Sequence, residues 1–280
     1  MTTDDRGGGA APTEAVPPAA HQAGPLAAAA FAQRTAGQQA AFFLPHLRPG
    51  LRVLDVGCGP GSITVGLAAA VASGEVVGID ADPERVALAR ARAAQAGAAN
   101  LRVERADVRA LPFPAASFDA ALVHAVLEHL PDPGAALREV RRVLKPGGVV
   151  GARSPDYGAG VLLYPPDPLL EEVFAWHARL KDAEAGAGAA GGARMGRALR
   201  AALQAAGFRD VTGAASMECA GTAAETRATA ELFEQFLGMA RFDAVADAAT
   251  RARAVAAWRV WGAHPDAFVA VPWGEALGWV

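Results

Sequence analysis

Residues 51–80 read LRVLDVGCGPGSITVGLAAAVASGEVVGID, and this stretch decides the fold. An apolar run leads into three glycines spaced two apart, Gly57, Gly59 and Gly61. An alanine-rich segment follows, and a second apolar run then ends at Asp80. The order of strand, glycine turn, helix, strand and acid is typical of the first half of a nucleotide-binding α/β sheet. Glycines let the backbone pass close to a ligand, and a strand-end carboxylate can accept hydrogen bonds from both ribose hydroxyls, so we expect an adenosine-type cofactor.

The glycine spacing and the local charge narrow the choice of cofactor. A dinucleotide fingerprint would place a third glycine where Ser62 stands, and no Gly-Lys-Ser/Thr ending of a phosphate-binding loop follows. Residues 53–84 contain no lysine or arginine, and Asp55 precedes the turn. A pyrophosphate would therefore meet only backbone dipoles and a repelling carboxylate. A ligand with an ammonium and a sulfonium group but no phosphate fits better, and S-adenosylmethionine is such a ligand.

The composition indicates a globular protein with one large domain or two small ones. Of the 280 residues, 52% are hydrophobic and 20% are charged, and a net charge of −3 without a basic run argues against a nucleic-acid partner. The two cysteines, Cys58 and Cys219, predict a reducing, cytoplasmic location and no metal cluster. No apolar run reaches the ~20 residues that a membrane helix needs, so we expect no membrane partner.

The domain organisation follows from composition along the chain. Residues 1–24 consist mainly of Ala, Gly and Pro, which predicts a disordered tail. Their acidic start and the weakly apolar run at residues 26–30 argue against a signal peptide. We expect one domain over residues 25–280, with a cofactor half over about 50–155 and a substrate or lid half over about 156–280. All tryptophans and tyrosines lie in the second half, where we expect the acceptor pocket.

Strands that alternate with helices at short spacing predict a parallel sheet with right-handed crossovers. We expect strands over residues 51–56, 75–80, 101–106, 118–123 and 149–153, and helices over 26–47, 82–97 and 132–144, the last two capped by Asp82 and Asp132. Beyond them we expect helices over 167–182 and 194–206, a strand over 208–217, a helical region over 222–261 and a strand over 267–273. The last two strands should pair antiparallel at one edge of the sheet.

Four segments, in order and at ordinary intervals, resemble the class I S-adenosylmethionine-dependent methyltransferases. The likeness is greatest to the branch that contains the ubiquinone and menaquinone C-methyltransferases and many small-molecule methyltransferases. The resemblance implies a Rossmann-like sheet with an antiparallel edge and helical lid insertions in the second half. The segments are VLDVGCGPG (53–61), VVGIDADPERVALAR (76–90), ADVRALPFPAASFDAALVHAVLEHLPDP (106–133) and LREVRRVLKPGGVV (137–150).

The resemblance also implies a cofactor site at the carboxyl ends of the strands, where open α/β sheets bind their ligands. In this family's arrangement, each of nine residues would meet a particular part of the cofactor. At the methionine portion, the backbone would come from Gly57, Cys58 and Gly59, and Asp55 would face the ammonium. Asp80 would bind the ribose, and His124 would lie beside the sulfonium and the acceptor. Ala81 would lie beneath the adenine, Asp107 would accept from its amino group, and the Val108 backbone would meet the ring edge.

Several of these residues have simpler interpretations. Asp80 could be a solvated acid or a helix cap, although Asp82 already fills the cap position. Asp107 could belong to a polar loop. His124 could be structural, could contact the acceptor, or could be its general base, and the sequence leaves these roles open.

Other residues are expected to be structural. His129, on the helix expected after strand four, and Cys58 are expected to pack rather than react. Arg34 could pair with the cofactor carboxylate, but an exposed arginine on the N-terminal helix is the simpler expectation. Trp258 and Trp261 are three residues apart on one helix and are expected to fill the core or the lid.

The sequence thus predicts transfer of a methyl group to a small, largely apolar metabolite, within a biosynthetic pathway. It leaves open the acceptor, the methylated element (O, N or C) and the oligomeric state. One alternative is a protein that binds S-adenosylmethionine without transferring its methyl group, as a regulator or a cyclase. Another is an NAD-dependent dehydrogenase, which Ser62 and the missing cationic phosphate contacts disfavour.

Overall fold

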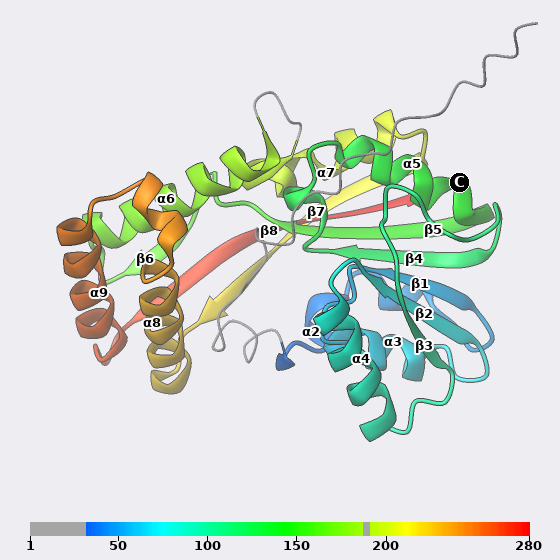
Figure 1. Ribbon diagram of the computed structural model, residues 1–280, viewed down its shortest axis with the longest axis horizontal. Coiled ribbons are helices and arrows are strands. Elements are labelled where there is room, and N and C mark those ends of the chain that lie inside the picture. The colour runs from blue at the N-terminus through cyan, green and yellow to red at the C-terminus, as the bar shows by residue number, and fades with distance from the viewer. Residues whose placement is uncertain (1–31, 159, 187–190) are drawn as a thin grey trace, which may run out of the picture.

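The computed structural model describes residues 32–158, 160–186 and 191–280, so the tail expected at residues 1–24 lies outside the described residues. An eight-stranded sheet forms the centre of the described structure (Figure 1). Its strands are β1 (Arg52–Val56), β2 (Glu75–Asp80), β3 (Leu101–Arg105), β4 (Phe118–His124), β5 (Leu144–Pro155), β6 (Leu162–Tyr164), β7 (Arg209–Ala220) and β8 (Phe268–Trp279).

The sheet has a parallel part and an antiparallel edge. Strands β3, β2, β1, β4 and β5 lie side by side in that order and are parallel, so their carboxyl ends meet at one edge. Strand β8 runs antiparallel to β5 and pairs antiparallel with β7 and β6 as well. The predicted Rossmann-like sheet with an antiparallel edge is therefore confirmed.

Helices and 3-10 turns fill the intervals between the strands. The segments at residues 83–95 and 133–143 are capped by Asp82 and Asp132, whose side chains accept from backbone N–H groups as the sequence predicted. The elements are α2 (Ala36–Gln39), η2 (Leu44–His46), α3 (Ser62–Ala70), α4 (Pro83–Gln95), η3 (Leu127–His129), α5 (Pro133–Val143), α6 (Pro168–Ala185), η4 (Gly192–Arg194), α7 (Met195–Ala205), α8 (Ala223–Leu237), η5 (Ala240–Ala244) and α9 (Ala248–Gly262).

The helix predicted over residues 26–47 is wrong for the part that the structure describes. Residues 32–47 contain the single turn α2 and the 3-10 turn η2. The Thr35 side chain accepts from the Gln38 backbone N–H and begins α2, and Pro45 lies within η2. Phe43 between them is fully buried against the sheet. Burial of the apolar side chains, rather than helical propensity, determines the local path here.

Two further predictions on strands need correction. Residues 145–148, expected to be a loop, belong to β5, where the register against β4 shifts between Phe118 and Ala120 and Gly147 has a φ of 77°. The short strand β6 was not predicted, because three residues carry too little pattern to show in the sequence. It pairs with residues 268–270 of β8.

Three large hydrophobic cores, with a small fourth one beneath α4, hold the described fold together. Helices α5 and α7 cover one face of the parallel strands, and α2 and α3 cover the other. The third core lies in a helical cap, which consists of α6, α8 and α9 and packs at the far end of β8 from strands β1–β3 (Figure 1). Trp258 and Trp261 are buried in this cap core, which confirms the prediction that they serve packing.

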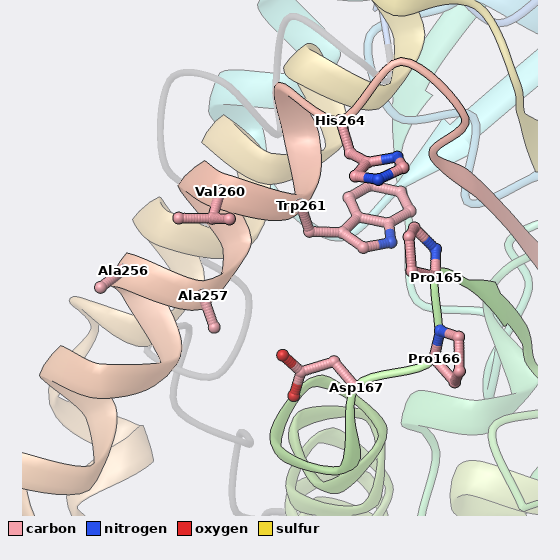
Figure 2. Close-up of a pocket in the computed structure, with 8 residues that line it drawn as sticks. All are labelled: Pro165, Pro166, Asp167, Ala256, Ala257, Val260, Trp261 and His264. Atoms are coloured by element: carbon pink, nitrogen blue, oxygen red, sulfur yellow. The ribbon is translucent and has the colours of Figure 1, made fainter.

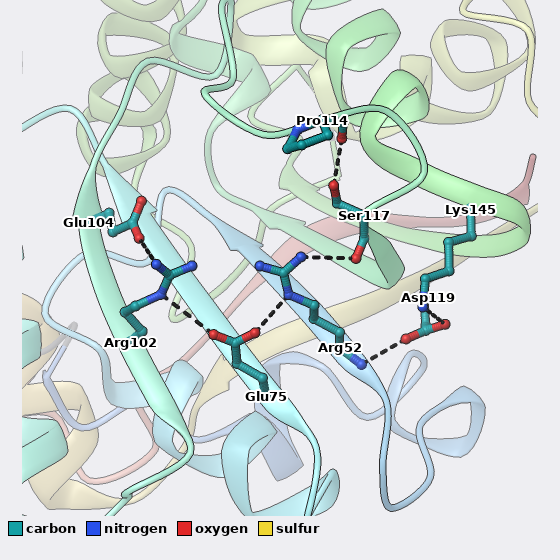
Figure 3. Close-up of polar contacts among 8 residues, drawn as sticks. All are labelled: Arg52, Glu75, Arg102, Glu104, Pro114, Ser117, Asp119 and Lys145. Carbon is teal, nitrogen blue, oxygen red and sulfur yellow. Dashed lines mark hydrogen bonds and ion pairs between the residues drawn. The ribbon is translucent and has the colours of Figure 1, made fainter.

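The amino ends of the parallel strands carry a network of paired charges (Figure 3). Arg52 Nε donates to Glu75 Oε2 at 2.7 Å, and Arg102 lies 3.5 Å from the same carboxylate. Lys145 Nζ donates to Asp119 Oδ1 at 2.7 Å, and the Arg52 backbone N–H donates to Asp119 Oδ2 at 2.8 Å. Each of these charged side chains thus faces an opposite charge.

Among the described residues, no helix is both long and apolar enough to cross a bilayer.

Candidate functional site

Asp55 lies in β1, one residue before the strand's end, and is only 2% exposed. Thr64 Oγ1 of α3 donates to Asp55 Oδ2 at 2.6 Å. Burial raises the pKa of Asp55 to about 7; the Thr64 hydrogen bond opposes that rise and the nearby Asp80 carboxylate adds to it. The sequence therefore places a buried acid beneath the glycine turn, and no lysine or arginine among the described residues pairs with it.

The glycine turn follows Asp55 directly. Gly57 has a φ of 68°, and a Cβ atom there would lie 2.3 Å from Val126 Cγ2 in the loop after β4. Gly59 has a φ of 53°, and a Cβ atom there would meet nothing within 4 Å. The first glycine is thus required by a close approach within the protein, whereas the backbone at the second borders open space.

Asp80 ends β2 and is fixed by backbone donors. The Gly59 N–H donates to Asp80 Oδ2 and the Asp82 N–H donates to Oδ1, each at 3.0 Å. A carboxylate oxygen has two lone pairs, so each oxygen keeps capacity for one further hydrogen bond. The geometry ties the strand-end acid to the glycine turn and orients it.

Two other predicted residues lie beside this acid. Cys58 is buried, its backbone N–H donates to the Ile79 carbonyl at 2.9 Å, and burial raises the pKa of its thiol. A buried thiol with a raised pKa is a poor nucleophile, as expected for a packing residue. Ala81 is exposed, and its carbonyl accepts from Arg105 Nε at 3.1 Å.

Asp107 follows β3 and is occupied by a partner that the sequence analysis did not consider. Arg109 donates to it through Nε at 3.0 Å to both oxygens and through Nη2 at 2.6 Å. These bonds hold the pKa of Asp107 below its usual value. Val108, between them, is buried in the main core. An adenine amino group would have to share the Asp107 carboxylate with Arg109, so the adenine-reading role remains a prediction.

His124 ends β4 and is 7% exposed. Its Nε2 lies 3.2 Å from Arg153 Nη1 and 3.2 Å from Gln39 Oε1, and its ring stacks on Trp273 with centroids 5.3 Å apart. Burial, with added repulsion from Arg34 and Arg153, holds the pKa of His124 well below its usual value. The predicted site residue is therefore a neutral ring enclosed by other side chains.

The residues that enclose His124 come from distant parts of the chain, and of them only Arg34 was considered from the sequence as a possible site residue. Arg153 ends the predicted fifth strand and is 3% exposed; its Nε donates to Glu275 Oε1 at 3.2 Å, and its guanidinium lies 4.2 Å from the Trp273 ring centroid. An arginine at the end of an apolar strand was the available signal for it.

Arg34 belongs to this enclosure, so the prediction of an exposed helix arginine is wrong. It precedes α2, its side chain is 19% exposed, and it lies 3.8 Å from Glu218 and 5.4 Å from the Trp273 ring centroid. Residues 33–35 are not helical, and the Arg34 side chain lies toward β7 and β8.

A second polar cluster lies where η3 meets the helical cap. Glu128 is buried, its Oε2 accepts from Ser154 Oγ at 3.0 Å, and burial raises its pKa. His129 lies on the 3-10 turn η3 rather than on a helix, with Nδ1 3.0 Å from Lys181 Nζ of α6. On the same side of α6, His177 is buried, and burial lowers its pKa to about 3. These groups join the carboxyl edge of the sheet to the cap.

A pocket of about 370 Å³ lies elsewhere, within the helical cap, between the loop before α6 and helix α9 (Figure 2). It contains none of the predicted site residues. It is lined by Pro165, Pro166, Asp167, Ala256, Ala257, Val260, Trp261 and His264. In the described ranges, no three His, Cys, Asp or Glu side chains are grouped so that they could hold a metal ion.

The carboxyl edge fits S-adenosylmethionine on two grounds. Asp55 and Asp80 lie close enough for one to raise the other's pKa, and among the described residues neither is paired with a lysine or arginine. Two acids without a cation favour a ligand that carries positive charge. The open space beside Gly59 gives such a ligand access to the backbone.

Comparison with known proteins gives a family for this part of the chain. Residues 53–148 match a family model described as a methyltransferase domain. An uncharacterized methyltransferase of Schizosaccharomyces pombe is 40% identical over 133 residues, which cover 45% of this chain and 47% of that protein. A demethylmenaquinone methyltransferase of Staphylococcus aureus is 40% identical over 105 residues, which cover 37% of this chain and 43% of that protein. The chain thus spans less than half the length of these relatives.

Solved structures share the fold over most of the chain. The YcgJ protein of Bacillus subtilis superposes with a TM-score of 0.56 at 22% identity, covering 85% of this chain and 96% of that one. Phosphoethanolamine N-methyltransferase 2 of Haemonchus contortus, solved in complex with S-adenosyl-L-methionine, gives a TM-score of 0.53 at 19% identity, covering 87% of this chain and 52% of that one. At such identities the likeness establishes the architecture.

Proposed function

We propose that the chain, whose residues 53–148 match a model described as a methyltransferase domain, is a class I S-adenosylmethionine-dependent methyltransferase that transfers a methyl group to a small, largely apolar metabolite. The observation that carries the proposal is the pair of acids Asp55 and Asp80 at the glycine turn, which no described lysine or arginine neutralises. Such a pair suits a cofactor that is cationic and lacks phosphate.

Each proposed cofactor contact uses a group described above. Asp55 would face the ammonium of the methionine portion, the backbone of residues 57–59 would border that portion, and Asp80 would accept from the ribose hydroxyls. Ala81, Asp107 and Val108 would border the adenine, with Asp107 held in place by Arg109. When bound, the cofactor supplies an activated methyl group on a sulfonium centre.

The protein's own contribution is to align the acceptor and to exclude water. His124, enclosed by Arg153, Gln39 and Trp273 at the end of β4, is placed to border the acceptor. We propose that residues 156–280 supply the rest of the acceptor site, because Tyr157 packs edge-on against His177 4.8 Å away, next to the cap. Aromatic side chains there suit an acceptor with apolar surface.

A biosynthetic role, a cytoplasmic location and a single domain over residues 25–280 belong to the same proposal. The cytoplasmic location is supported by Cys58 and Cys219, both of which are free thiols.

Calorimetry tests the cofactor, and a labelled methyl donor tests the transfer. We expect S-adenosylmethionine to bind and NAD to give no heat of binding at the same concentrations. Incubation of the protein with methyl-labelled donor and a metabolite extract should then move the label into a small product, which mass spectrometry identifies. Binding of NAD instead would overturn the cofactor assignment. Tight binding of S-adenosylmethionine with no transfer to any metabolite would identify a binding protein, a regulator or a cyclase.

A further inference from the structure

The ring of His124 contacts the guanidinium of Arg153, a group that only donates hydrogen bonds. Arg153 Nη1 lies 3.2 Å from His124 Nε2, and the same Nη1 group donates to Gln39 Oε1. Gln39 Oε1 also lies 3.2 Å from His124 Nε2, but this oxygen already accepts from Arg153 Nη1. A guanidinium has only N–H donors and stays charged, so we take the charged Arg153 contact to decide the tautomer, with the histidine nitrogen that faces it offering a lone pair. A neutral imidazole with a lone pair on Nε2 carries its proton on Nδ1.

Burial and two nearby guanidinium groups oppose a second proton on this ring. Arg153 comes from β5 and Arg34 from the segment before α2, and both repel an imidazolium. The facing acids, Glu275 of β8 and Glu218 of β7, are taken up by Arg153 and Arg34 respectively, at 3.2 and 3.8 Å. Trp273 covers a ring face and removes water. Burial and the two guanidinium groups together leave His124 neutral.

We propose that Arg153 is a positioning residue that fixes His124 with its proton on Nδ1 and its Nε2 lone pair occupied, so that His124 meets the acceptor as a hydrogen-bond donor and not as its base. The role toward the acceptor rests on the proposed function, whereas the protonation state of the ring does not. It resolves the choice that the sequence leaves open for His124. It also favours a class of acceptor: one whose reacting atom already has a free lone pair or a negative charge at neutral pH.

Nitrogen-15 NMR of the protein without cofactor tests the protonation state directly. The chain has six histidines, and the His124→Gln variant identifies the His124 signals by their loss. In the unsubstituted protein we expect a protonated Nδ1 and an unprotonated Nε2 whose shifts stay constant from about pH 8 to about pH 5, because a free histidine would titrate near 6.5. Titration of His124 near 6.5, or a proton on Nε2, would overturn the proposal.

Substitution of Arg153 tests its part. Arg153→Met removes the donor and one of the two repelling charges, so the His124 midpoint should rise by about one pH unit or more and the Nε2-protonated form should appear. Lys145→Met, at the amino end of the sheet, is the matched control and should leave His124 unchanged. If Arg153→Met perturbs the other histidines, Arg153→Lys is used instead, because it keeps the charge but lacks the planar guanidinium. This variant should change the ratio of the Nδ1-protonated to the Nε2-protonated form of His124. An unchanged His124 spectrum in the folded arginine variant would overturn the proposal.

A kinetic arm uses the product found in the methyl-donor screen. His124→Asn keeps a side-chain N–H donor, so its kcat should exceed that of His124→Ala by about tenfold, roughly the strength of one hydrogen bond. Equal kcat values, or an acidic limb of the pH profile that only the unsubstituted enzyme shows, would contradict the donor role. If no transfer is detected while the NMR result holds, the proposed function fails and the assignment of the ring stands.

Discussion

The charged side chains at the two ends of the parallel strands differ in their pairing and their burial. At the amino end, the charges of Arg52, Glu75, Asp119 and Lys145 are paired and partly exposed (Figure 3). At the carboxyl end, Asp55 is buried, and in the part of the chain that the structure describes no lysine or arginine pairs with it. Exposed pairs contribute only about 0–1 kcal/mol each, whereas an unneutralised buried acid costs stability. The amino end of the sheet is thus arranged for stability, whereas the carboxyl end carries a destabilising acid, as is typical of ligand sites.

The largest expected effect is on stability, at Asp55. Its pKa is raised above the unfolded value near 3.9, so the folded protein holds this proton between about pH 4 and 7 and loses stability as the pH rises through that window. Asp55→Asn should therefore gain free energy of unfolding relative to the unsubstituted protein as the pH rises from 4 to 8, by up to about 4 kcal/mol. Denaturant unfolding at both pH values measures it. If the stability difference between the two proteins does not change with pH, the pKa of Asp55 is not raised, and the contrast between the two ends of the sheet fails.

The next effect is on cofactor affinity, at Asp80. Asp80→Ala removes the proposed ribose acceptor and the anchor of the Gly59 N–H, and a charge-assisted hydrogen bond is worth roughly 1.5–3 kcal/mol. The affinity for S-adenosylmethionine in calorimetry should fall about ten- to a hundredfold. Unchanged affinity in a folded variant would remove Asp80 from the site.

A smaller effect is expected at Asp107, because Arg109 already engages both oxygens. Asp107→Ala should weaken S-adenosylmethionine binding several-fold, and Asp107→Asn should weaken it less, since the amide keeps one acceptor oxygen. Arg109→Ala serves as the companion variant: if Arg109 only orients the acid, its loss should cost less affinity than Asp107→Ala. Equal and negligible effects of both Asp107 variants would make this residue part of a polar loop.

The smallest effect is expected at the paired end of the sheet. Glu75→Gln weakens the pairs with Arg52 and Arg102, and it should lower the free energy of unfolding by no more than about 1 kcal/mol, less at high salt. The affinity for S-adenosylmethionine should not change. A loss of affinity here comparable to that of Asp80→Ala would mean that the two ends are coupled, and the comparison would fail.

The sequence predicted those helices and strands whose ends are set by nearby residues. Strand β2 has the predicted bounds, and α4 begins at the predicted cap, Asp82, because glycine, proline and acidic caps act over a few residues. The irregular segment before β1 was mispredicted, since the burial of Phe43 against the sheet outweighs helical propensity. Strand β6 exists only because β8 pairs with it, about a hundred residues later in the chain.

The sequence predicted the acids and glycines of the site but not the side-chain contacts around His124. The acids and glycines follow from strand ends, which a repeated α/β pattern places at one edge. The state of His124 depends on Arg153 and Gln39, and the position of Arg153 depends on Glu275, 122 residues away. No spacing rule relates residues so far apart, because strand pairing alone brings them together. The choice between a general base and an acceptor contact at His124 therefore could not be made from the sequence, and both remain predictions for the experiments above.

Strand β8 lies between β5 and β7, although it follows both in the chain. During synthesis, both neighbours therefore keep a long row of unpaired backbone groups until residues 268–279 have left the ribosome. Trp273, which stacks on His124, and Glu275, which pairs with Arg153, are also missing until then. A newly made chain thus passes through a stage with open strand edges that other chains can join. The rate at which β8 enters the sheet should set how much of the protein escapes aggregation during its synthesis.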